Sequence, residues 1–516
     1  MTLPAGTMAR TGNSAHKWGL TSDRKQKMTR GAQKQGPSIV WFRDDLRLAD
    51  NQALTAAVAA PAPLLCVYIF DEESEGFRPH GGASRWWLHH SLAALGGEIS
   101  KKGGRLDLFR GRAKDILPAL AAAASAGAAF WTRRYGGAEI ALDTVLKTRL
   151  VAAGVKTQSF NGQLLHEPWE VKRGARGSFM VYSPYWRAAL ALPDAGAPLD
   201  APEKILASPY SRGAPKRKSL DELGLLPKRC DWAAGLSANW RPGEKGAQKR
   251  LGDFLANGLQ AYASARDRPA DDAISRLSPH LRFGEISPRQ IFAAVRAAET
   301  ERPELKAGAS KFLGELGWRE FNYHVFFSHP NAATTNLQRR FDAMPWRDPP
   351  LHELKAWRRG QTGYPLVDAG MRELWTTGFM HNRARMAAAS FLVKHLLIDW
   401  RIGEEWFWDT LCDADPANNP MNWQWVAGSG ADAAPYFRVF NPVLQGEKFD
   451  PRGDYVRRWI PELAALPDKW IHKPWAAPAA VLLEARVELG KTYPKPVVDL
   501  ADGRDRALKA FEAVRR

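Results

Sequence analysis

The stretch Ser38-Ile39-Val40-Trp41-Phe42 is a short apolar run of the kind that forms a buried β-strand. Further short runs of β-branched or apolar residues recur at residues 64–70, 105–110, 128–133 and 156–160, with helix-length segments between them. Short strands that alternate with helices are typical of βαβ units, which build a parallel sheet through right-handed crossovers. We therefore predict a doubly wound α/β domain over residues 37–165.

The pattern changes twice after this domain. Between residues 166 and 235 Pro, Gly and basic residues accumulate, which is typical of a long surface linker. From residue 236 to about 500 helical periodicity predominates, so a second, all-helical domain is predicted there, followed by a C-terminal segment at 501–516. The expected fold class is α/β plus all-α. Helices are predicted over residues 244–255, 288–298, 311–327, 364–377, 382–398 and 404–411.

The composition is that of an ordinary globular protein. The chain has 516 residues, of which 45% are apolar and 25% charged, so a disordered or fibrous protein is excluded. No run of about 18 apolar residues is present, and we expect no membrane-spanning segment.

The first 36 residues form a basic segment. They hold seven Lys or Arg residues and one Asp, without the apolar stretch of a signal peptide. We predict a disordered tail at 1–36. The alternatives are an arm that binds DNA non-specifically and a chain that truly begins at Met28.

Charge and cysteine content limit the classes of partner and cofactor. Lys and Arg outnumber Asp and Glu by 73 to 55, a formal net charge of +18, which favours nucleic acid as a partner, although a well-solvated surface is the simpler alternative. Cys66, Cys230 and Cys412 lie too far apart for a disulfide framework, a Cys-only zinc site or a four-thiolate iron–sulfur cluster. We expect no metal, and a reducing, cytoplasmic location.

Several ordered motifs carry the functional information. No G-x-G-x-x-G turn follows the first strand, where Trp41-Phe42-Arg43-Asp44-Asp45-Leu46-Arg47 stands instead, so a standard dinucleotide site is not expected there. Further along come Trp318-Arg319-Glu320-Phe321, Gly363-Tyr364-Pro365-Leu366-Val367-Asp368 and His381-Asn382-Arg383-Ala384-Arg385-Met386. With such motifs spread over residues 38–475, the sequence resembles the photolyase/cryptochrome family of flavoproteins, and most of all its cyclobutane-pyrimidine-dimer photolyases.

The resemblance implies an antenna-binding α/β domain at 37–165 and a helical, FAD-binding catalytic domain at 236–500. It implies light-driven repair of cyclobutane pyrimidine dimers in ultraviolet-damaged DNA, by electron transfer from excited reduced FAD. A cryptochrome-type blue-light receptor without repair activity is the alternative, and a nucleotide-binding protein without photochemistry is a third. No obligate protein partner is implied, and we expect a monomer.

The implied flavin site places hydroxyl, backbone N–H and guanidinium groups on the FAD phosphates. Ile274 stands where many relatives have Thr, so one phosphate hydrogen bond is expected to be absent or replaced. Asn419 matches the residue that faces flavin N5, where an amide can accept from N5–H and favours reduced flavin; its neighbour Asn418 competes for this role. By resemblance the cofactor-binding residues are Tyr262, Ser275, Arg276, Leu277, Ser278, Arg319, Arg385, Asp413, Asp415 and Asn419.

The substrate site is expected between two helical faces. Spacing puts Glu315 and Trp318 on one face and Asn382 and Met386 on another. The resemblance implies that the acid and the amide bind the polar edges of the dimer, while the aromatic rings and the thioether enclose its bases. The simpler alternative is that Glu315 pairs with Arg319 at i+4 and that Met386 fills core. The implied catalytic set is Glu315, Trp318, Asn382, Met386 and Trp425.

The chain contains 21 tryptophans, an unusually large number, which makes stacking or electron transfer worth testing. By resemblance, Trp346, Trp400 and Trp423 form an electron-transfer chain that feeds the flavin. Three packed core aromatics are the alternative.

Basic residues near the substrate set are implied as DNA contacts. Arg383, Arg438 and Lys448 are expected to bind phosphates, joined by Arg339 and Arg340. A solvated surface is the alternative for each of them.

An antenna pigment is expected in the α/β domain. Folate-binding relatives have Asn-Glu where this chain has Ala138-Glu139, so only Glu139 carries over. A methenyltetrahydrofolate antenna is favoured over deazaflavin.

Overall fold

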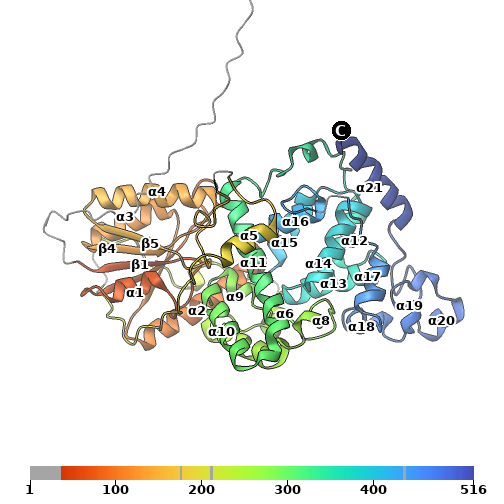
Figure 1. Ribbon diagram of the computed structural model, residues 1–516, viewed down its shortest axis with the longest axis horizontal. Helices are drawn as coiled ribbons and strands as arrows, with labels where there is room; N and C mark the ends of the chain where they lie inside the picture. Colours follow the sequence, from red (N-terminus) through yellow and green to blue (C-terminus); the bar gives the residue numbers. More distant parts are fainter. Residues whose placement is uncertain (1–35, 175–176, 210–212, 230, 434–436, 516) are drawn as a thin grey trace, which may run out of the picture.

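The computed structural model describes residues 36–174, 177–209, 213–229, 231–433 and 437–515. Figure 1 shows an α/β part at one end of the molecule and a helical part that fills the rest. The predicted basic tail, apart from Gly36, lies outside the described residues, as does Cys230.

The α/β part contains a five-stranded sheet in which all neighbouring strands are parallel. The strand order is β3-β2-β1-β4-β5, so the winding reverses between β1 and β4. The predicted doubly wound parallel sheet is confirmed. The strands are β1 (Ser38–Phe42), β2 (Leu64–Phe70), β3 (Leu106–Arg110), β4 (Ala128–Thr132) and β5 (Lys156–Phe160).

Helices cover both faces of the sheet because its central strands are apolar on both sides. In β1, Val40 and Phe42 pack in the apolar cluster that contains α1 and α2, whereas Ile39 and Trp41 pack in the cluster that contains α3 and α4. Successive strand residues point to opposite faces, so a strand that is apolar throughout requires two layers of helices. These helices are α1 (Gln52–Val58), α2 (Gly82–Lys101), α3 (Ala113–Ala123) and α4 (Gly137–Ala152).

The C-terminal half is helical, as predicted. Helix α13 begins at Pro365 and ends before Gly378, whose φ of 65° lies in the left-handed region. The helix predicted over 382–398 is α14, which continues into the π-helical turn η5. The elements are α6 (Ala234–Asn239), α7 (Glu244–Asp253), η2 (Phe254–Gly258), α8 (Tyr262–Ala265), α9 (Ser278–Arg282), α10 (Pro288–Glu301), α11 (Lys306–Ser328), α12 (Leu351–Arg359), α13 (Pro365–Thr377), α14 (Asn382–Ser390), η5 (Phe391–His395), α15 (Trp400–Thr410), α16 (Asn418–Ala427), α17 (Pro442–Phe449), α18 (Asp454–Trp459), α19 (Asp468–Ile471), α20 (Ala479–Glu484) and α21 (Leu500–Arg515).

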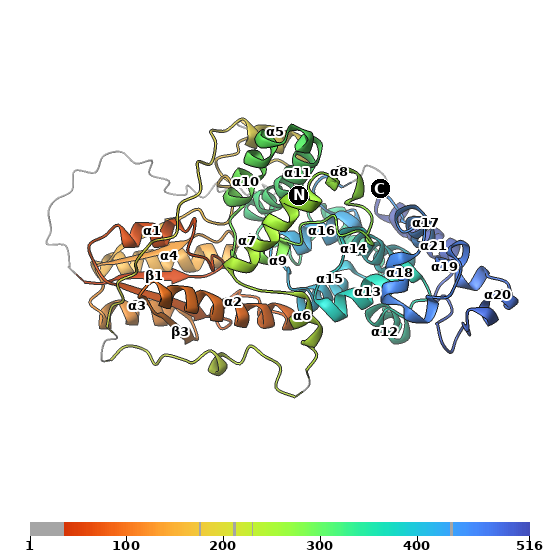
Figure 2. The same cartoon turned by 90° about the horizontal axis from the view of Figure 1, so that it is seen from below.

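Residues 166–235, interpreted from the sequence as a linker, contain the helix α5 (Tyr182–Leu190). Tyr185 of this helix is buried in an apolar cluster that includes residues of α11. The stretch that follows is mostly irregular and runs along the α/β part to α6 (Figure 2). A backbone bridge between Lys218 and Leu108 of β3 attaches it to the sheet.

The carboxyl edge of the sheet is joined to the helical part by polar contacts. Asp44, just after β1, accepts a hydrogen bond from Arg282 of α9 at 2.9 Å. Arg47 donates to the carbonyl oxygen of Gly284 at 2.9 Å. Gly284 has a φ of 64°, and a Cβ there would lie 2.1 Å from the carbonyl oxygen of Asp44, so a larger residue does not fit. The polar motif after β1 therefore joins the two parts of the chain.

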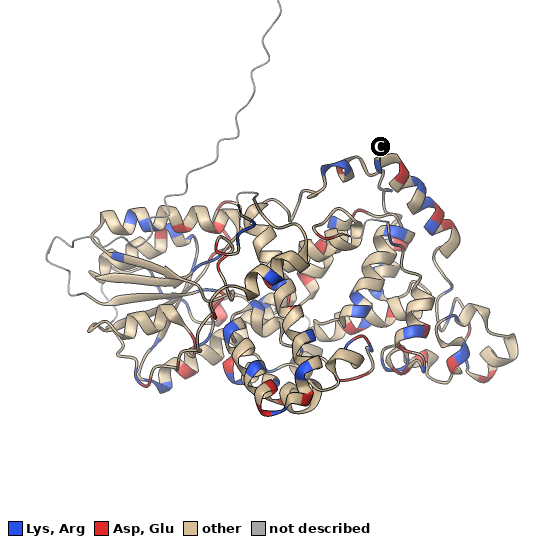
Figure 3. Cartoon of the chain, in the orientation of Figure 1, with Lys and Arg blue, Asp and Glu red and all other residues tan. Residues whose placement is uncertain are grey.

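Charged residues are spread over both parts of the chain. Figure 3 shows Lys and Arg interleaved with Asp and Glu on helices and loops. Within the described residues, no helix combines the length and the apolar character that a membrane span requires.

Candidate functional site

A cavity of about 470 Å³ lies in the helical part, lined by residues of α8, α9, α11, α14 and α16. Every residue that the sequence predicted for the flavin or for the substrate lines this cavity. They are Tyr262, Ser275, Arg276, Leu277, Ser278, Glu315, Trp318, Arg319, Asn382, Arg385, Met386, Asp413, Asp415, Asn419 and Trp425.

Arg276 presents its guanidinium group from a strained backbone. Its φ of 50° lies in the left-handed region that residues with a side chain rarely adopt. The Nε atom is buried and has no hydrogen-bond partner among the described residues. The guanidinium carbon lies 5.5 Å from the ring centre of Phe379. The group therefore suits an anionic part of a ligand.

Arg385 is oriented by Asp413. Its Nη1 and Nη2 donate to Oδ1 and Oδ2 of Asp413 at 3.1 and 2.8 Å. The hydroxyl of Ser278 donates to the same Oδ2 at 2.6 Å. Because a bidentate pair fixes the plane of the guanidinium, Asp413 holds groups of α14 and α9 together at the cavity wall.

Asp415 organises the beginning of α16. Its Oδ1 accepts from the backbone N–H groups of Ala417 and Asn418 at 2.9 and 2.7 Å. Its Oδ2 accepts from the hydroxyl of Tyr323 at 2.8 Å. Most of the acceptor capacity of Asp415 is thus used within the protein, on the tyrosine hydroxyl and on the backbone N–H groups at the start of α16.

The two neighbouring asparagines differ in what their amides contact. Asn418 donates to Asp415 at 2.9 Å and accepts from Asn322 at 2.8 Å, so both ends of its amide are used. Asn419 donates from Nδ2 to Oε1 of Glu404 at 2.8 Å, and no donor among the described residues reaches its Oδ1. This arrangement favours Asn419 as the residue that offers an oxygen to the cavity.

Glu315 is paired with an arginine that the sequence did not predict. Arg266 donates to Oε1 of Glu315, and the Nζ of Lys311 lies 3.8 Å from the same oxygen. Arg319 instead donates to the carbonyl oxygen of Gln163 at 2.6 Å. The alternative that paired Glu315 with Arg319 is therefore wrong.

The two predicted aromatic walls are held in place by neighbours. The ring of Trp318 stacks on Tyr182 of α5, with ring centres 3.9 Å apart and planes 10° from parallel. The hydroxyl of Tyr182 donates to the carbonyl oxygen of Gly314 at 2.6 Å. Trp425 donates from Nε1 to the carbonyl oxygen of Asp432 at 3.1 Å.

Asn382 and Met386 face the cavity from the first turns of α14. The Nδ2 of Asn382 lies 3.9 Å from the sulfur of Met386. His381 caps the helix, since its Nδ1 accepts from the backbone N–H of Arg383 at 3.1 Å. Burial lowers the pKa of His381 to about 4, so its ring stays neutral and able to accept.

The three tryptophans of the predicted electron-transfer chain share one apolar cluster. Trp423 lines the cavity, and its ring contacts those of Phe407 and Trp357, with centres 4.9 and 6.3 Å away. Trp400 is fully buried, and Trp346 packs at the edge of the cluster. Among the ring contacts of the described residues, none joins Trp423 directly to Trp400. The order of electron transfer stays a prediction.

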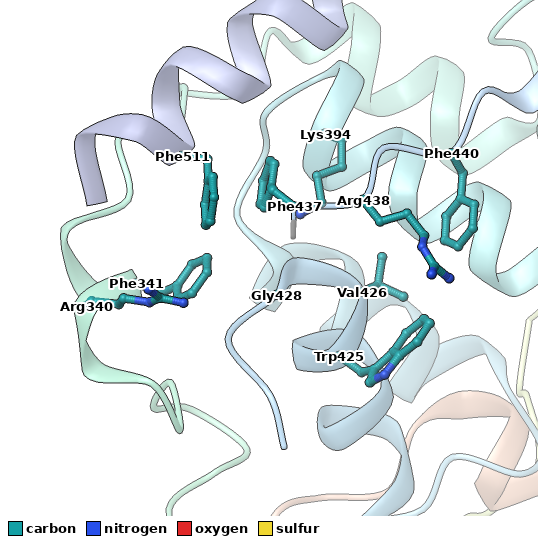
Figure 4. A pocket seen from close by; sticks show the side chains of 10 residues that line it. All are labelled: Arg340, Phe341, Lys394, Trp425, Val426, Gly428, Phe437, Arg438, Phe440 and Phe511. Atoms are coloured by element: carbon teal, nitrogen blue, oxygen red, sulfur yellow. The ribbon is translucent and has the colours of Figure 1, made fainter. Parts of the chain in front are cut away.

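The predicted DNA contacts lie outside the large cavity. Arg383 pairs with Asp267 at 2.8 Å, and Lys448 is exposed on α17. Arg438 and Trp425 line a smaller cavity (Figure 4). Trp425 also lines the large cavity and so borders both.

Sequence analysis missed several residues that complete the site. Tyr182 lies in the stretch interpreted as a linker. Arg282 belongs to the short helix α9, and Glu404 to the predicted helix that is α15, and neither is part of a functional motif. Their partners are distant in sequence, so no local pattern reveals them. Arg266 follows Tyr262 by four residues, and that spacing is a signal that could have placed both on one helical face.

The donors and acceptors around the cavity suit a flavin adenine dinucleotide. The unpaired Nε of Arg276, the guanidinium of Arg385 and the hydroxyls of Ser275 and Ser278 can bind phosphates. The free amide oxygen of Asn419 can accept from a ring N–H group.

Comparisons with known proteins agree with this assignment. Residues 38–203 match the family model described as DNA photolyase, and residues 312–513 match that of the FAD binding domain of DNA photolyase. A deoxyribodipyrimidine photo-lyase of Agrobacterium fabrum is 52% identical over 483 residues, which cover 94% of this chain and 99% of that protein. Cryptochrome-2 of Arabidopsis thaliana is 39% identical over 486 residues, which cover 93% of this chain and 79% of that protein.

The fold agrees as well. The crystal structure of a bacterial class III photolyase from Agrobacterium tumefaciens matches with a TM-score of 0.88 at 50% identity, covering 94% of this chain and 99% of that chain. The predicted two-part fold, the flavoprotein character and the FAD cofactor are confirmed. This chain belongs to the photolyase/cryptochrome family of FAD-binding proteins.

Proposed function

We propose that this chain is a deoxyribodipyrimidine photo-lyase, which splits cyclobutane pyrimidine dimers in ultraviolet-damaged DNA when it is illuminated. The observation that carries the proposal is that one cavity is lined both by phosphate-binding and flavin-directed groups and by the acid, amide, thioether and aromatic groups of the substrate set. Arg276, Arg385 and Ser278 would hold FAD in this cavity, and reduced FAD under blue light would supply the one-electron chemistry that opens the dimer without net oxidation or reduction.

The residues of the chain bind and orient the dimer. Glu315 and Asn382 offer hydrogen bonds to the polar edges of the two pyrimidines. Trp318 and Trp425 enclose the bases and keep water away from the reacting bonds. Arg266 donates a hydrogen bond to Glu315, and its positive charge stabilises the ionised carboxylate, which can accept hydrogen bonds from the dimer.

The dimer has to leave the DNA stack to reach the cavity. A base pair inside the duplex is inaccessible to a pocket of this kind, so the damaged nucleotides are flipped out. We propose that three basic residues hold the flanking phosphates. They are Arg383 in the first turn of α14, Lys448 on α17, and Arg438, which lines the smaller cavity with Trp425. The net charge of +18 favours this association at low salt.

A direct assay tests the function. The FAD-loaded protein is reduced without oxygen, mixed with ultraviolet-damaged oligothymidine and illuminated with blue light, and the thymine absorbance is followed. Recovery of absorbance that needs both light and protein is expected. If the protein holds FAD and light reduces that FAD, but no absorbance is recovered, the result would favour the blue-light receptor. The 39% identity to a cryptochrome is the observation behind this second candidate.

Replacing Glu315 by Ala should impair repair but not flavin binding. The loss of a hydrogen bond to a charged group costs about 1.5–3 kcal/mol, so repair at limiting substrate should fall roughly 10- to 100-fold. The matched control is Glu301→Ala, because Glu301 is exposed at the end of α10 and does not line the cavity. Equal repair by both variants, with FAD bound, contradicts the role of Glu315.

We also propose a methenyltetrahydrofolate antenna near Glu139, with deazaflavin as the rival. Glu139 lies in the first turn of α4, and a Cβ on the neighbouring Gly137 would lie 3.0 Å from Pro330, so this turn adjoins the helical part. Extraction of the pigments from purified protein and their absorption spectra distinguish folate, deazaflavin and FAD alone.

A further inference from the structure

Asn419 lines the cavity with one end of its amide unused. Its Nδ2 donates to the side-chain Oε1 of Glu404 at 2.8 Å and to the carbonyl oxygen of Glu404 at 3.1 Å. These acceptors use both N–H groups, and within the described residues nothing donates to Oδ1. The orientation of an amide follows from the partners of its nitrogen and oxygen. The oxygen of Asn419 is therefore the atom left for a ligand.

Glu404 is itself held by an arginine of the α/β part. Its side chain is 4% exposed, and a carboxylate in such a place requires a partner for its charge. Arg78 supplies that partner through two hydrogen bonds, from Nη1 to Oε1 at 2.7 Å and from Nη2 to Oε2 at 2.8 Å. Since a carboxylate has only acceptor oxygens, Glu404 can hold the amide of Asn419 only through its N–H groups.

Arg78 lies in the loop between β2 and α2, on the far side of the boundary between the two parts of the chain. Its guanidinium carbon also lies 4.1 Å from the ring centre of Trp408 on α15. This stacking and the bidentate pair fix its position. A connection of three side chains, Arg78 to Glu404 to Asn419, therefore runs from the α/β part to the cavity wall.

We infer that Arg78 and Glu404 are positioning residues that fix the amide of Asn419 with its oxygen toward flavin N5. The inference rests on the proposed function, which places FAD in this cavity, and on the assignment of Asn419 to N5. An amide oxygen accepts from N5–H, which reduced flavin carries, whereas an amide N–H would instead favour the oxidised ring, whose N5 is an acceptor. Arg78 of the α/β part thereby stabilises reduced FAD although it does not itself line the cavity.

The test measures the reduction potential of bound FAD in the dark, in the whole protein, for Glu404→Leu and Arg78→Ala. At a fixed potential, the ratio of reduced to oxidised flavin should fall about five- to tenfold in Glu404→Leu, the effect of one hydrogen bond. Arg78→Ala should shift the ratio in the same direction by a smaller factor. Arg78→Lys keeps the positive charge and should restore part of the loss.

Two controls separate positioning from a general loosening of the interface. Asp409, also on α15, accepts from the backbone N–H of Gly82 at 2.8 Å and so joins the same two parts without contacting Asn419. Asp409→Ala should keep the wild-type potential. In an Asn419→Ala background, Glu404→Leu should produce no further shift, because the amide through which it acts is gone.

The outcomes are distinct. A wild-type potential in Glu404→Leu with FAD bound overturns the inference, and so does a shift that persists in the Asn419→Ala background. If Glu404→Leu does not retain FAD, Arg78→Ala, on a side chain one-third exposed, decides instead. A wild-type protein that takes up no FAD overturns the proposed function and this inference together, whereas FAD uptake with unchanged potentials in all variants overturns the inference alone.

Discussion

At the scale of single residues, the cavity depends on carboxylates whose main partners are other protein groups. Asp413 accepts from Arg385 and Ser278, and Asp415 from Tyr323 and the first turn of α16. Their role in this arrangement is to orient the groups that meet a cofactor. A carboxylate of this kind affects binding through the geometry of its neighbours.

Replacing Asp413 by Asn should therefore weaken FAD binding. The amide keeps the shape of the side chain but loses the charged, bidentate contact that fixes Arg385. A loss of about 1.5–3 kcal/mol corresponds to a dissociation constant for FAD roughly 10- to 100-fold larger. Fluorescence titration of the apoprotein with FAD measures this change.

The matched control for this prediction is Asp399→Asn. Asp399 also pairs with an arginine, Arg401, at 2.8 Å, but it does not line the cavity. Its substitution should leave the dissociation constant for FAD unchanged. An Asp413 variant that binds FAD as tightly as the Asp399 variant contradicts the orienting role.

Which residues line the site could be predicted from the sequence, but which residues they pair with could not. The sequence motifs identified Arg385, Asp413 and Glu315 as site residues by resemblance, and all three line the cavity. Local spacing suggested Arg319 as the partner of Glu315, whereas the fold supplies Arg266, which directly follows α8. Which side chains form an ion pair depends on their distance in the folded chain, and i+4 spacing along one helix does not predict contacts with other segments.

At the scale of elements, helix α14 matters most because its first turns carry Asn382, Arg385 and Met386 to the cavity. Its beginning is set by His381, whose neutral ring accepts from the N–H of Arg383. Burial lowers the pKa of His381 from 6.5 to about 4. Between these two pH values, His381 therefore binds a proton in the unfolded chain but not in the folded chain.

This cap predicts a pH dependence of stability. As the pH falls from 6.5 to about 4, the unfolded chain takes up a proton at His381 before the folded chain does, so the folded state loses stability. His381→Asn keeps a good cap but does not titrate. Relative to that variant, the wild type should lose roughly 1.4 kcal/mol per pH unit in this window. Denaturant unfolding at several pH values measures the difference, and a difference independent of pH contradicts the prediction.

Elements could be predicted where their signal is local. All five strands could be predicted to within a residue of their observed ends. The buried strands β1, β2 and β4 are short apolar runs with turn residues on both sides. The partly buried edge strands β3 and β5 follow from the regular alternation of strands and helices. Helix α5 could not be predicted because Pro and Gly surround it. Its Tyr182 and Tyr185 pack against α11, a contact between distant segments that no local pattern reveals. The π-helical turn after α14 likewise has no periodicity of its own.

At the scale of the whole molecule, the contact between the two parts of the chain shapes the cavity. Arg282 donates from Nη1 to Asp44 at 2.9 Å and from Nε to the carbonyl oxygen of Ala414 at 2.8 Å, between the two cavity aspartates. Burial alone would raise the pKa of Asp44, but the charges of Arg282 and Arg134 outweigh it and lower the pKa to about 2. The α/β part thus anchors the loop that carries Asp413 and Asp415.

Replacing Arg282 by Ala should destabilise the protein and release FAD together. Arg282 is buried, whereas the Asp44 side chain is 20% exposed, so water compensates part of the charge that stays behind. The loss should be about 3 kcal/mol, the low end of the range for buried pairs. A double variant, Asp44→Ala with Arg282→Leu, removes both charges and should recover much of the stability. It cannot restore the hydrogen bond to Ala414, so its FAD affinity should stay low. Thermal unfolding followed by circular dichroism, with flavin release followed by fluorescence, separates the two effects. Full recovery of FAD binding in the double variant would show that Arg282 acts on the cavity only through overall stability.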